Sequence, residues 1–321
     1  DLRGGPAVTA MLIQNTNPMS VCPDLNLVRK GFMRDDLFVC VHEQFMTETA
    51  RMADIVLPAT MFLEHDDVYQ GGGHQHIIVG PKIIDAPGEC RSNHDVIRAI
   101  ASRVGAEHRG FHMNAREIAG ELLSSSGWGS IDALESQHWI DCQPPFDEAH
   151  YIKGFGHADG RFHFKPAWTR HGQQGRVPDT IRESMPKLPD HWAAIESASA
   201  EHPFRLVTAP ARHFLNSSFN ETKTSRRREG KPTALIHPED AATLNVHDGA
   251  RVRLGNSRGE VELTVETKTG HQAGVVVVES LWPNEAFPGG LGINALTGAD
   301  PAGPVGGAAF HDTRIWIKPA D

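Results

Sequence analysis

The chain has 321 residues, of which 39% are hydrophobic and 22% charged, a composition typical of an ordinary globular protein with about two domains at ~150 residues each. Its net charge of −9 argues against a nucleic-acid partner, and no apolar run approaches the ~18 residues that a membrane span needs. The four cysteines are far apart and include no Cys-x-x-Cys pair, which excludes the usual zinc and iron–sulfur signatures.

The N-terminal part of the chain alternates short apolar runs with stretches of helical spacing. Strands are expected at residues 10–14, 37–41 and 55–58, and helices at residues 24–33 and 47–52. Strands that alternate with helices over short links are typical of a parallel α/β sheet. Ligands of such sheets bind at the carboxyl ends of the strands, which here are residues 14–17, 42–47 and 58–64. No Gly-x-Gly-x-x-Gly is present, so the ordinary dinucleotide fingerprint is absent.

A histidine-rich stretch follows the third expected strand. His74 and His76 would share one face of an extended segment with His65 nearby, and together they suggest a metal site. The glycines at residues 71–73 imply a close backbone approach instead, so we favour solvated histidines or histidines along a substrate channel.

The middle of the chain carries two amphipathic helices and then loses its periodicity. Helices are expected at residues 93–104 and 115–124, because apolar residues recur there at helical spacing. Residues 160–166 favour one short strand. Residues 173–203 read as a connecting segment that we expect to pack poorly against either core.

The last third of the chain consists of short strands separated by glycine turns. Strands are expected at residues 204–208, 234–237, 250–254, 261–267 and 275–278. Several strands this short predict a small closed barrel, with Pro238 opening a helix beside it. Arg226, Arg227 and Arg228 form the main basic cluster, which is either a solvated loop or a contact with phosphates or a neighbouring domain.

Four stretches in this last third resemble one protein family. They are Ile236–Ala242, His247–Val252, Ser257–Val261 and Gly292–Thr297. In order and spacing they look like the C-terminal domain of the molybdopterin oxidoreductases, the group that includes dimethyl sulfoxide reductase, nitrate reductase and formate dehydrogenase. The resemblance implies a six-stranded double-psi β-barrel that covers the pterin and nucleotide ends of the cofactor.

The α/β part resembles the third domain of the same enzymes, which binds one guanosine of the paired cofactor. The resemblance rests on Thr16-Asn-Pro, Glu43–Ala50, and Ala53–Pro58 with Glu64. It implies that Glu43 accepts the two N–H groups of a guanine edge, while Asn15, Asn17 and Thr47 hold ribose or phosphate oxygens. The alternative is that Asn17-Pro is a plain turn and Thr47 a plain helix cap.

In the barrel, the resemblance assigns the pterin and the other nucleotide to polar loop residues. Asn294 can pair with a pterin or guanine edge, although a glycine-rich barrel corner without a ligand gives the same pattern. The expected cofactor-binding residues of the barrel are Thr208, Arg212, His213, Asn216, Ser217, Asn294 and His311. No residue is assigned as catalytic or as a metal ligand.

The resemblance implies a fold of class α/β plus β, with a partial doubly wound parallel sheet followed by a double-psi barrel. Residues 1–110 would form a nucleotide-binding segment, residues 111–202 a helical and irregular connecting region, and residues 203–321 the molybdopterin dinucleotide-binding barrel. The implied cofactor is bis-molybdopterin guanine dinucleotide with molybdenum or tungsten. Enzymes of this kind transfer an oxygen atom or a hydride equivalent with two electrons.

The chain begins at Asp1 without an initiator methionine, so we expect it to be the C-terminal portion of a longer polypeptide and inactive alone. The missing N-terminal half would be its first partner and would carry any iron–sulfur cluster, and an electron-transfer subunit would be a second. The alternative is a stand-alone molybdopterin-binding or assembly subunit. A hydrolase would suit the 19 histidines, but no His-Glu-x-x-His motif supports it.

If both halves hold one ligand, the polar residues at their strand ends must face each other. Polar groups buried without partners are costly unless water reaches them. We therefore expect an open, wet groove between the two domains, with Glu43 and Asn294 on its wall.

Overall fold

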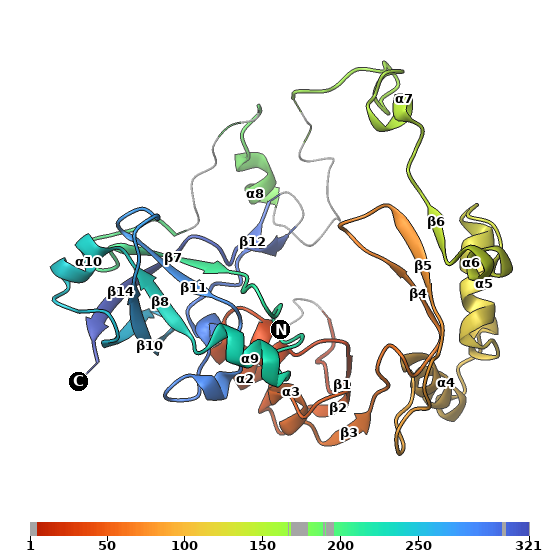
Figure 1. Cartoon of the computed structure of the whole chain (residues 1–321), viewed down its shortest axis with the longest axis horizontal. Helices are drawn as coiled ribbons and strands as arrows, with labels where there is room; N and C mark the ends of the chain where they lie inside the picture. The colour runs from red at the N-terminus through yellow and green to blue at the C-terminus, as the bar shows by residue number, and fades with distance from the viewer. Residues whose placement is uncertain are drawn as a thin grey trace.

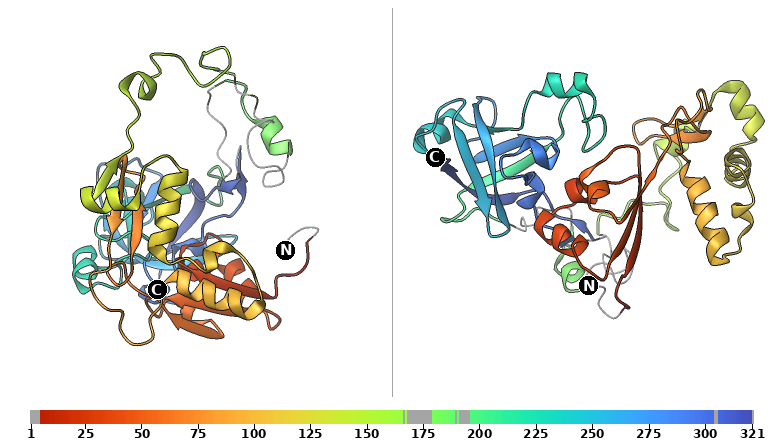
Figure 2. Two further views of the ribbon diagram at one scale, coloured as in Figure 1. Left: turned by 90° about the vertical axis from the view of Figure 1, so that its right-hand side faces the viewer. Right: turned by 90° about the horizontal axis from the view of Figure 1, so that it is seen from below.

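The computed structural model describes residues 5–165, 167, 179–188, 190, 196–303 and 306–320. The chain forms a barrel from its C-terminal residues, a small parallel sheet from its N-terminal residues, and an arm from the residues between them (Figure 1). The parallel sheet lies between the barrel and the arm in the right-hand view of Figure 2. Within the described residues, every helix is too short or too polar to cross a lipid bilayer.

The parallel sheet has three strands and a layer of helices on one face. Strands β1 (Ala10–Gln14), β2 (Phe38–Glu43) and β3 (Ile55–Pro58) pair in that order, and helices α1 (Pro18–Val21), α2 (Leu25–Phe32) and α3 (Glu48–Arg51) connect them. Ile13, Val39 and Val41 are buried against Ala50 of α3. The expected α/β winding is therefore confirmed. Thr47 caps α3 by accepting a hydrogen bond from the Ala50 amide.

Part of the other face of this sheet is apolar and exposed, whereas His42 at its carboxyl end is buried and contacts the Arg91 carbonyl. Leu12, Phe38 and Ile55 are 41%, 48% and 46% exposed, and Leu12 and Ile55 both lie in register with Cys40 between them. Parallel sheets occur almost only where both faces are covered, because the crossover connections place helices on each side. The sheet therefore presents a face that suits a further layer of helices.

The arm contains an antiparallel sheet with helices packed against it. Its elements are β4 (Asp67–Gln70), β5 (His76–Gly80), α4 (Asn93–Val104), η1 (Arg109–Phe111), α5 (Ala115–Ser125), α6 (Ile131–Gln137), β6 (Trp139–Asp141) and α7 (Phe146–Ala149). The two helices expected from the apolar spacing are α4 and α5. Ile77, Leu123 and Leu134 form the core of the arm. Because β6 pairs with β5, this sheet draws strands from both sides of residue 110.

One expectation for the connecting region is wrong. Residues 161–165 form no strand, because the Asp159 carboxylate accepts from the Arg161 amide and contacts His163, which turns the chain. Pro166 lies outside the described residues, as do residues 173–178, 189 and 191–195 of the connecting segment. In the described end of that segment, Glu196 forms an ion pair with Arg258 of the barrel at 2.5 Å, whereas residues 197–201 and Pro203 are exposed.

The predicted six-stranded barrel is confirmed. Its strands are β7 (Phe204–Ala209), β8 (Thr233–Ile236), β9 (Arg251–Asn256), β10 (Gly259–Thr267), β11 (Val275–Glu279) and β14 (Thr313–Pro319). They close in the order β10-β8-β11-β7-β14-β9, with β7–β11 and β8–β10 parallel and the other four neighbouring pairs antiparallel. Side chains that alternate along these strands fill the interior, including Ile236, Leu254 and Ile315 with no exposed surface.

The remaining helices and strands are short. They are α8 (Asp179–Ser184), α9 (Lys223–Glu229), α10 (Pro238–Thr243), η3 (Asn284–Ala286), η4 (Ile293–Ala295), β12 (Pro301–Ala302) and β13 (Gly307–Ala308). Helix α10 begins at Pro238, as expected, with His237 as its N-cap. The segment between β11 and β14, which carries η3 and η4, lies beside α1 and α2 of the parallel sheet (Figure 1).

Gly255 of β9 lies directly under the ring of Trp316 on the neighbouring strand β14, where a Cβ would fall within the indole. Gly255→Ala is therefore expected to reduce the free energy of unfolding by about 1–3 kcal/mol through overpacking. Urea denaturation measures the loss, and Gly307→Ala is the control, because a Cβ there meets open space. Removing the indole as well should relieve the clash, so strictly additive effects in Gly255→Ala/Trp316→Ala would contradict this account.

Candidate functional site

The parallel sheet and the barrel meet along a polar seam, which we define as α1 with Glu48 on one side and residues 284–297 on the other. Asn284 is its centre. Its side-chain amide donates to the Met19 carbonyl at 2.7 Å, and its backbone amide donates to the Glu48 carboxylate at 2.8 Å. Its side-chain oxygen accepts from the Gly292 amide at 2.8 Å. The side-chain amide and the backbone amide of Asn284 therefore join the two halves, while its side-chain oxygen fixes the barrel segment itself.

Asn294 extends the seam towards α2. Its amide donates to the Ser20 carbonyl and its oxygen accepts from the Thr297 hydroxyl, both at 2.9 Å. The Thr297 carbonyl accepts from the Asp24 amide at 2.9 Å, and the adjacent Leu25 is buried in the barrel core. The expectation that Asn294 lines an open groove is wrong, because its side chain is buried in this closed contact. Its role toward a cofactor stays a prediction.

Asn17, just after β1, is also turned inward. It is only 3% exposed, it donates to the Glu48 carboxylate at 3.0 Å, and its oxygen accepts from the Thr49 hydroxyl at 2.7 Å. The same carboxylate thus holds Asn17 and Asn284 together. Burial raises the pKa of the Cys22 thiol at the end of α1, which keeps that cysteine protonated. Through the hydrogen bonds of Glu48 with Asn17 and Asn284, the polar seam fixes the carboxyl end of β1 against the barrel.

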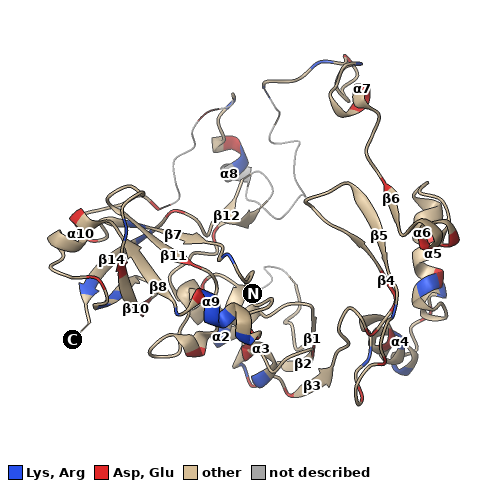
Figure 3. Cartoon of the chain, viewed as in Figure 1, with Lys and Arg blue, Asp and Glu red and all other residues tan. Residues whose placement is uncertain are grey.

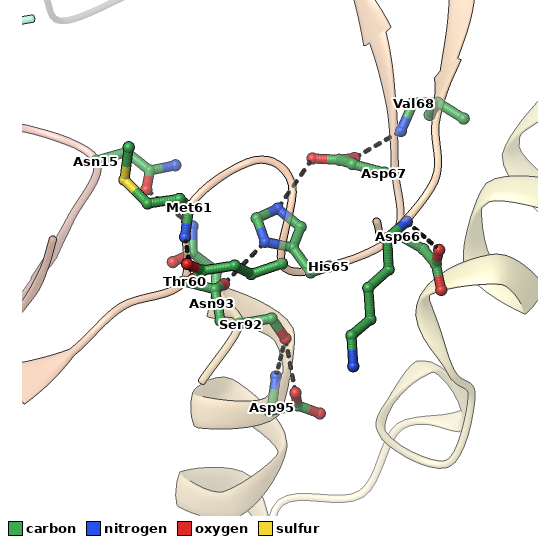
Figure 4. Close-up of polar contacts among 12 residues, drawn as sticks. Asn15, Thr60, Met61, His65, Asp66, Asp67, Val68, Ser92, Asn93 and Asp95 are labelled. Carbon is green, nitrogen blue, oxygen red and sulfur yellow. Dashed lines mark hydrogen bonds and ion pairs between the residues drawn. The ribbon is translucent and has the colours of Figure 1, made fainter. Parts of the chain in front are cut away.

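Two predicted nucleotide-binding side chains stand at the open ends of β1 and β2. Glu43 is half-buried, and one of its carboxylate oxygens accepts from the Gln44 amide at 2.7 Å. Asn15 is exposed with a left-handed backbone, φ 58°, and accepts from the Asn93 amide at 2.9 Å (Figure 4). Thr47 is buried as the cap of α3. The cofactor-binding role of these three residues stays a prediction.

The three histidines considered for a metal site lie in separate contacts. His65 is 2.8 Å from the Thr60 hydroxyl and 3.9 Å from the Asp67 carboxylate (Figure 4). The rings of His74 and His76 are 5.8 Å apart, centroid to centroid. Among the described residues, nowhere do three or more His, Cys, Asp or Glu side chains gather so that they could hold a metal ion.

The carboxyl ends of β7 and β11 lie side by side because these strands are parallel. Thr208 is at the end of β7, and the loop that follows carries Arg212, His213, Asn216 and Ser217. Arg212 and Asn216 are exposed, whereas His213 and Ser217 are half-buried. Each strand therefore delivers its following loop to the same end of the barrel.

An aromatic contact holds these two loops together. The buried Phe214 ring meets the buried Trp282 ring edge to face, with centroids 5.0 Å apart. The His213 amide donates to the Glu229 carboxylate of α9, which fixes the start of the loop. His311, the last predicted residue, is exposed in the turn before β14 and contacts Phe310. The cofactor-binding roles of all the barrel residues named from the sequence stay predictions.

Ser280 follows β11 at the same end of the barrel. It is only 5% exposed, it has a left-handed backbone with φ 76°, and its hydroxyl oxygen is buried without a hydrogen-bond partner among the described residues. Its amide donates to the Ala209 carbonyl at 2.7 Å, which places it against the end of β7. Neither Ser280 nor Asn284 was identified from the sequence. Only their position after an apolar strand could have pointed to them.

The basic cluster of α9 is drawn in blue in Figure 3. Arg226 is 4.0 Å from Glu285 of η3, and Glu285 is 3.9 Å from Arg51 of α3. Glu285 therefore lies between the basic helix and the parallel sheet. These ion pairs are exposed, so they contribute little stability.

Two cavities flank helix α4 and are separate from the strand ends described above. The larger has a volume of about 660 Å³, and its lining includes Arg91, Arg98, Glu107 and His112. The smaller, of about 350 Å³, includes His94 and lies between α4 and α5. None of the cofactor-binding residues named from the sequence lines either cavity.

Gly255-Asn-Ser-Arg-Gly259 matches the spacing of a hydrolase nucleophile motif. That motif needs a strand, a sharp turn and a helix. Here Ser257 lies in the hairpin between the antiparallel strands β9 and β10, and its side chain is exposed. The local structure therefore gives no support to a hydrolase.

Two family models match the chain, one in each half. The model described as molybdopterin oxidoreductase matches residues 5–103, and the model described as molydopterin dinucleotide binding domain matches residues 204–319. The first match covers the parallel sheet and α4, and the second covers the barrel.

Curated relatives align along most of the chain. The probable oxidoreductase YoaE of Bacillus subtilis is 33% identical over 318 residues, which is 99% of this chain and 45% of that protein. The dimethyl sulfoxide/trimethylamine N-oxide reductase of Rhodobacter capsulatus is 26% identical over 295 residues, 83% of this chain and 35% of that protein. The chain thus spans less than half the length of these relatives.

A solved structure shows the same fold. Acetylene hydratase from Pelobacter acetylenicus superposes with a TM-score of 0.79 at 18% identity, covering 99% of this chain and 45% of that one. The arrangement of sheet, arm and barrel is therefore that of a known fold.

Proposed function

The chain belongs to the molybdopterin oxidoreductases, and from that premise we propose that it binds a bis-molybdopterin guanine dinucleotide as part of an enzyme of the dimethyl sulfoxide reductase type. One observation carries the proposal. The polar seam holds the carboxyl end of β1 against the barrel segment that follows β11. Strand-end loops from both halves are thereby brought to one region, as a ligand shared between them requires.

The side chains in this region fit the chemistry of such a cofactor. The Glu43 carboxylate can accept the two N–H groups of a guanine edge, and the cationic Arg212 suits its phosphates. The Ser280 hydroxyl is buried, finds no partner among the residues that the structure describes, and can bond to a bound group. When bound, the cofactor would supply two-electron transfer of an oxygen atom or a hydride equivalent at molybdenum or tungsten. The residues of this chain would hold and orient it.

We further propose that a polypeptide corresponding to the remainder of these relatives completes the enzyme, with an electron-transfer subunit as a further partner. The chain covers 45% of YoaE. The exposed apolar surface at Leu12, Phe38 and Ile55 supports this, because a parallel sheet needs helices on both sides. An iron–sulfur cluster, where present, would belong to that other part.

The test of the binding role is Glu43→Gln in the intact protein. The glutamine oxygen can still accept from the Gln44 amide, but its NH₂ group would then face the guanine donors. A hydrogen bond to a charged group contributes roughly 1.5–3 kcal/mol, so cofactor occupancy is expected to fall about tenfold or more under limiting cofactor. Guanosine monophosphate, pterin and metal per chain are measured after purification.

Glu117→Gln is the matched control. The Glu117 carboxylate also accepts a backbone amide, from Asn114 at 2.7 Å, but it lies in the capping box of α5 in the arm. Equal cofactor content in the two variants would refute the assignment of Glu43. A wild-type protein without guanine or pterin would refute the proposed function itself.

A further inference from the structure

Ser280 combines two features that are costly in the structure. The residue is only 5% exposed, and its buried hydroxyl oxygen has no hydrogen-bond partner in the part of the chain that the structure describes. Buried polar side chains almost always have a partner, because burial removes the water that would otherwise bond to them. Its backbone φ of 76° lies in the left-handed region, which serine rarely adopts.

The surrounding contacts explain how this conformation is held. The Ser280 amide donates to the Ala209 carbonyl at 2.7 Å, which continues the parallel pairing of β11 with β7 by one residue. Trp282, two residues later, is buried against Phe214. The backbone of Ser280 is thus fixed on both sides, and the cost of the left-handed turn is met by its neighbours. Strain retained in this way is characteristic of ligand-binding positions.

The position of Ser280 identifies the ligand that its hydroxyl can meet. It follows β11, in register with the end of β7, where the loop with Arg212 to Ser217 begins. Four residues later, Asn284 contacts the parallel sheet. Ser280 therefore lies between the loop expected to bind the cofactor and the polar seam that fixes the end of β1.

We propose that the Ser280 hydroxyl donates a hydrogen bond to an acceptor oxygen of the bound molybdopterin guanine dinucleotide, on either its phosphates or its pterin carbonyl. This inference rests on the proposed function and names a contact within that site. It accounts for both costs, because the cofactor supplies the partner that the described residues do not. The left-handed turn aims the side chain away from the regular strand direction.

The test uses the opposite effects that Ser280→Ala should have on stability and on binding. In protein purified from a host that lacks the cofactor, removing an unpartnered hydroxyl should leave the urea midpoint unchanged or raise it by roughly 0.2–0.5 M. Ser280→Gly should raise it further, because glycine adopts the left-handed region freely. In protein from a host that makes the cofactor, both variants should retain guanine and pterin about five- to tenfold less well on dialysis.

Binding of guanosine diphosphate to the cofactor-free protein, measured by calorimetry, separates the two acceptor sources. A similar loss of affinity in Ser280→Ala indicates a phosphate oxygen, and unchanged affinity with poor cofactor retention indicates the pterin. Ser225→Ala, on α9, is the control and should change neither measurement. Full retention of cofactor by Ser280→Ala, with a wild type that is loaded, would overturn the inference and leave the proposed function standing. A lower urea midpoint in Ser280→Ala would show a structural hydroxyl and overturn it as well.

Discussion

Asn284→Leu is expected to reduce the free energy of unfolding by about 2–6 kcal/mol and to separate the parallel sheet from the barrel. Leucine has a similar volume but no polar atoms, so the Met19 carbonyl and the Gly292 amide lose their partners. Each buried group left unsatisfied costs roughly 1–3 kcal/mol. Urea denaturation measures the total, and hydrogen exchange of residues 284–297 shows where protection is lost.

Asn26→Leu is the matched control for the polar seam. Asn26 also connects the two halves, through one hydrogen bond from its amide to the Arg258 carbonyl at 2.9 Å, but that bond is exposed to water. Its loss is expected to cost no more than about 1 kcal/mol. Equal effects in the two variants would mean that the buried hydrogen bonds of Asn284 contribute no more than an exposed one, against the account of the seam given above.

Trp282→Ala is the second change with a large expected effect. The indole is 7% exposed and packs in the barrel core against Phe214. Truncating a buried aromatic side chain to alanine costs about 3–5 kcal/mol, part of it for the cavity that remains. Because Phe214 lies in the middle of the loop with Arg212 to Ser217, that loop should also loosen. The unfolding free energy and the cofactor content of the intact protein are both expected to fall.

Two further variants distinguish the loss of stability from the loss of cofactor content. Trp282→Phe keeps an aromatic ring against Phe214 and should recover most of the cofactor content while leaving a smaller loss of stability. Leu215→Ala, next to Phe214 but 59% exposed, should change neither quantity appreciably. If Trp282→Ala keeps a normal cofactor content at a temperature where it stays folded, the loop with Arg212 to Ser217 does not bind the cofactor.

Local patterns in the sequence predicted elements that are stabilised locally. The strand at residues 10–14 and the helix from residue 93 follow from apolar spacing, and Thr47 caps α3 because a threonine before a helical run can accept its amide. The strand expected at residues 160–166 failed for the converse reason. Its alternation of Phe162 and Phe164 looks like a strand, but the described residues there have no partner strand, and Asp159 turns the chain.

The candidate site could be predicted only in outline. Strand ends can be located in a sequence, so Glu43 and the loop after Thr208 were identified as places for a ligand. Whether a side chain at such an end is free depends on neighbours distant in the chain. Asn294 was expected to face a groove, but its side-chain NH₂ donates to the Ser20 carbonyl and its side-chain oxygen accepts from the Thr297 hydroxyl. The identity of the expected cofactor came from the resemblance to a family, because the spacing of the residues alone did not identify it.

The pairing of the first barrel strand with the last has a consequence for biosynthesis. Strand β14 pairs with β7 through Leu206 and Thr313, and with β9 through Leu254 and Ile317, so it closes the barrel from both sides. On the ribosome, β7 emerges about seventy residues before β11 and about a hundred residues before β14, which are its two neighbours in the barrel. Until β14 has been synthesised, one edge of β7 and one edge of β9 are unpaired and open to aggregation.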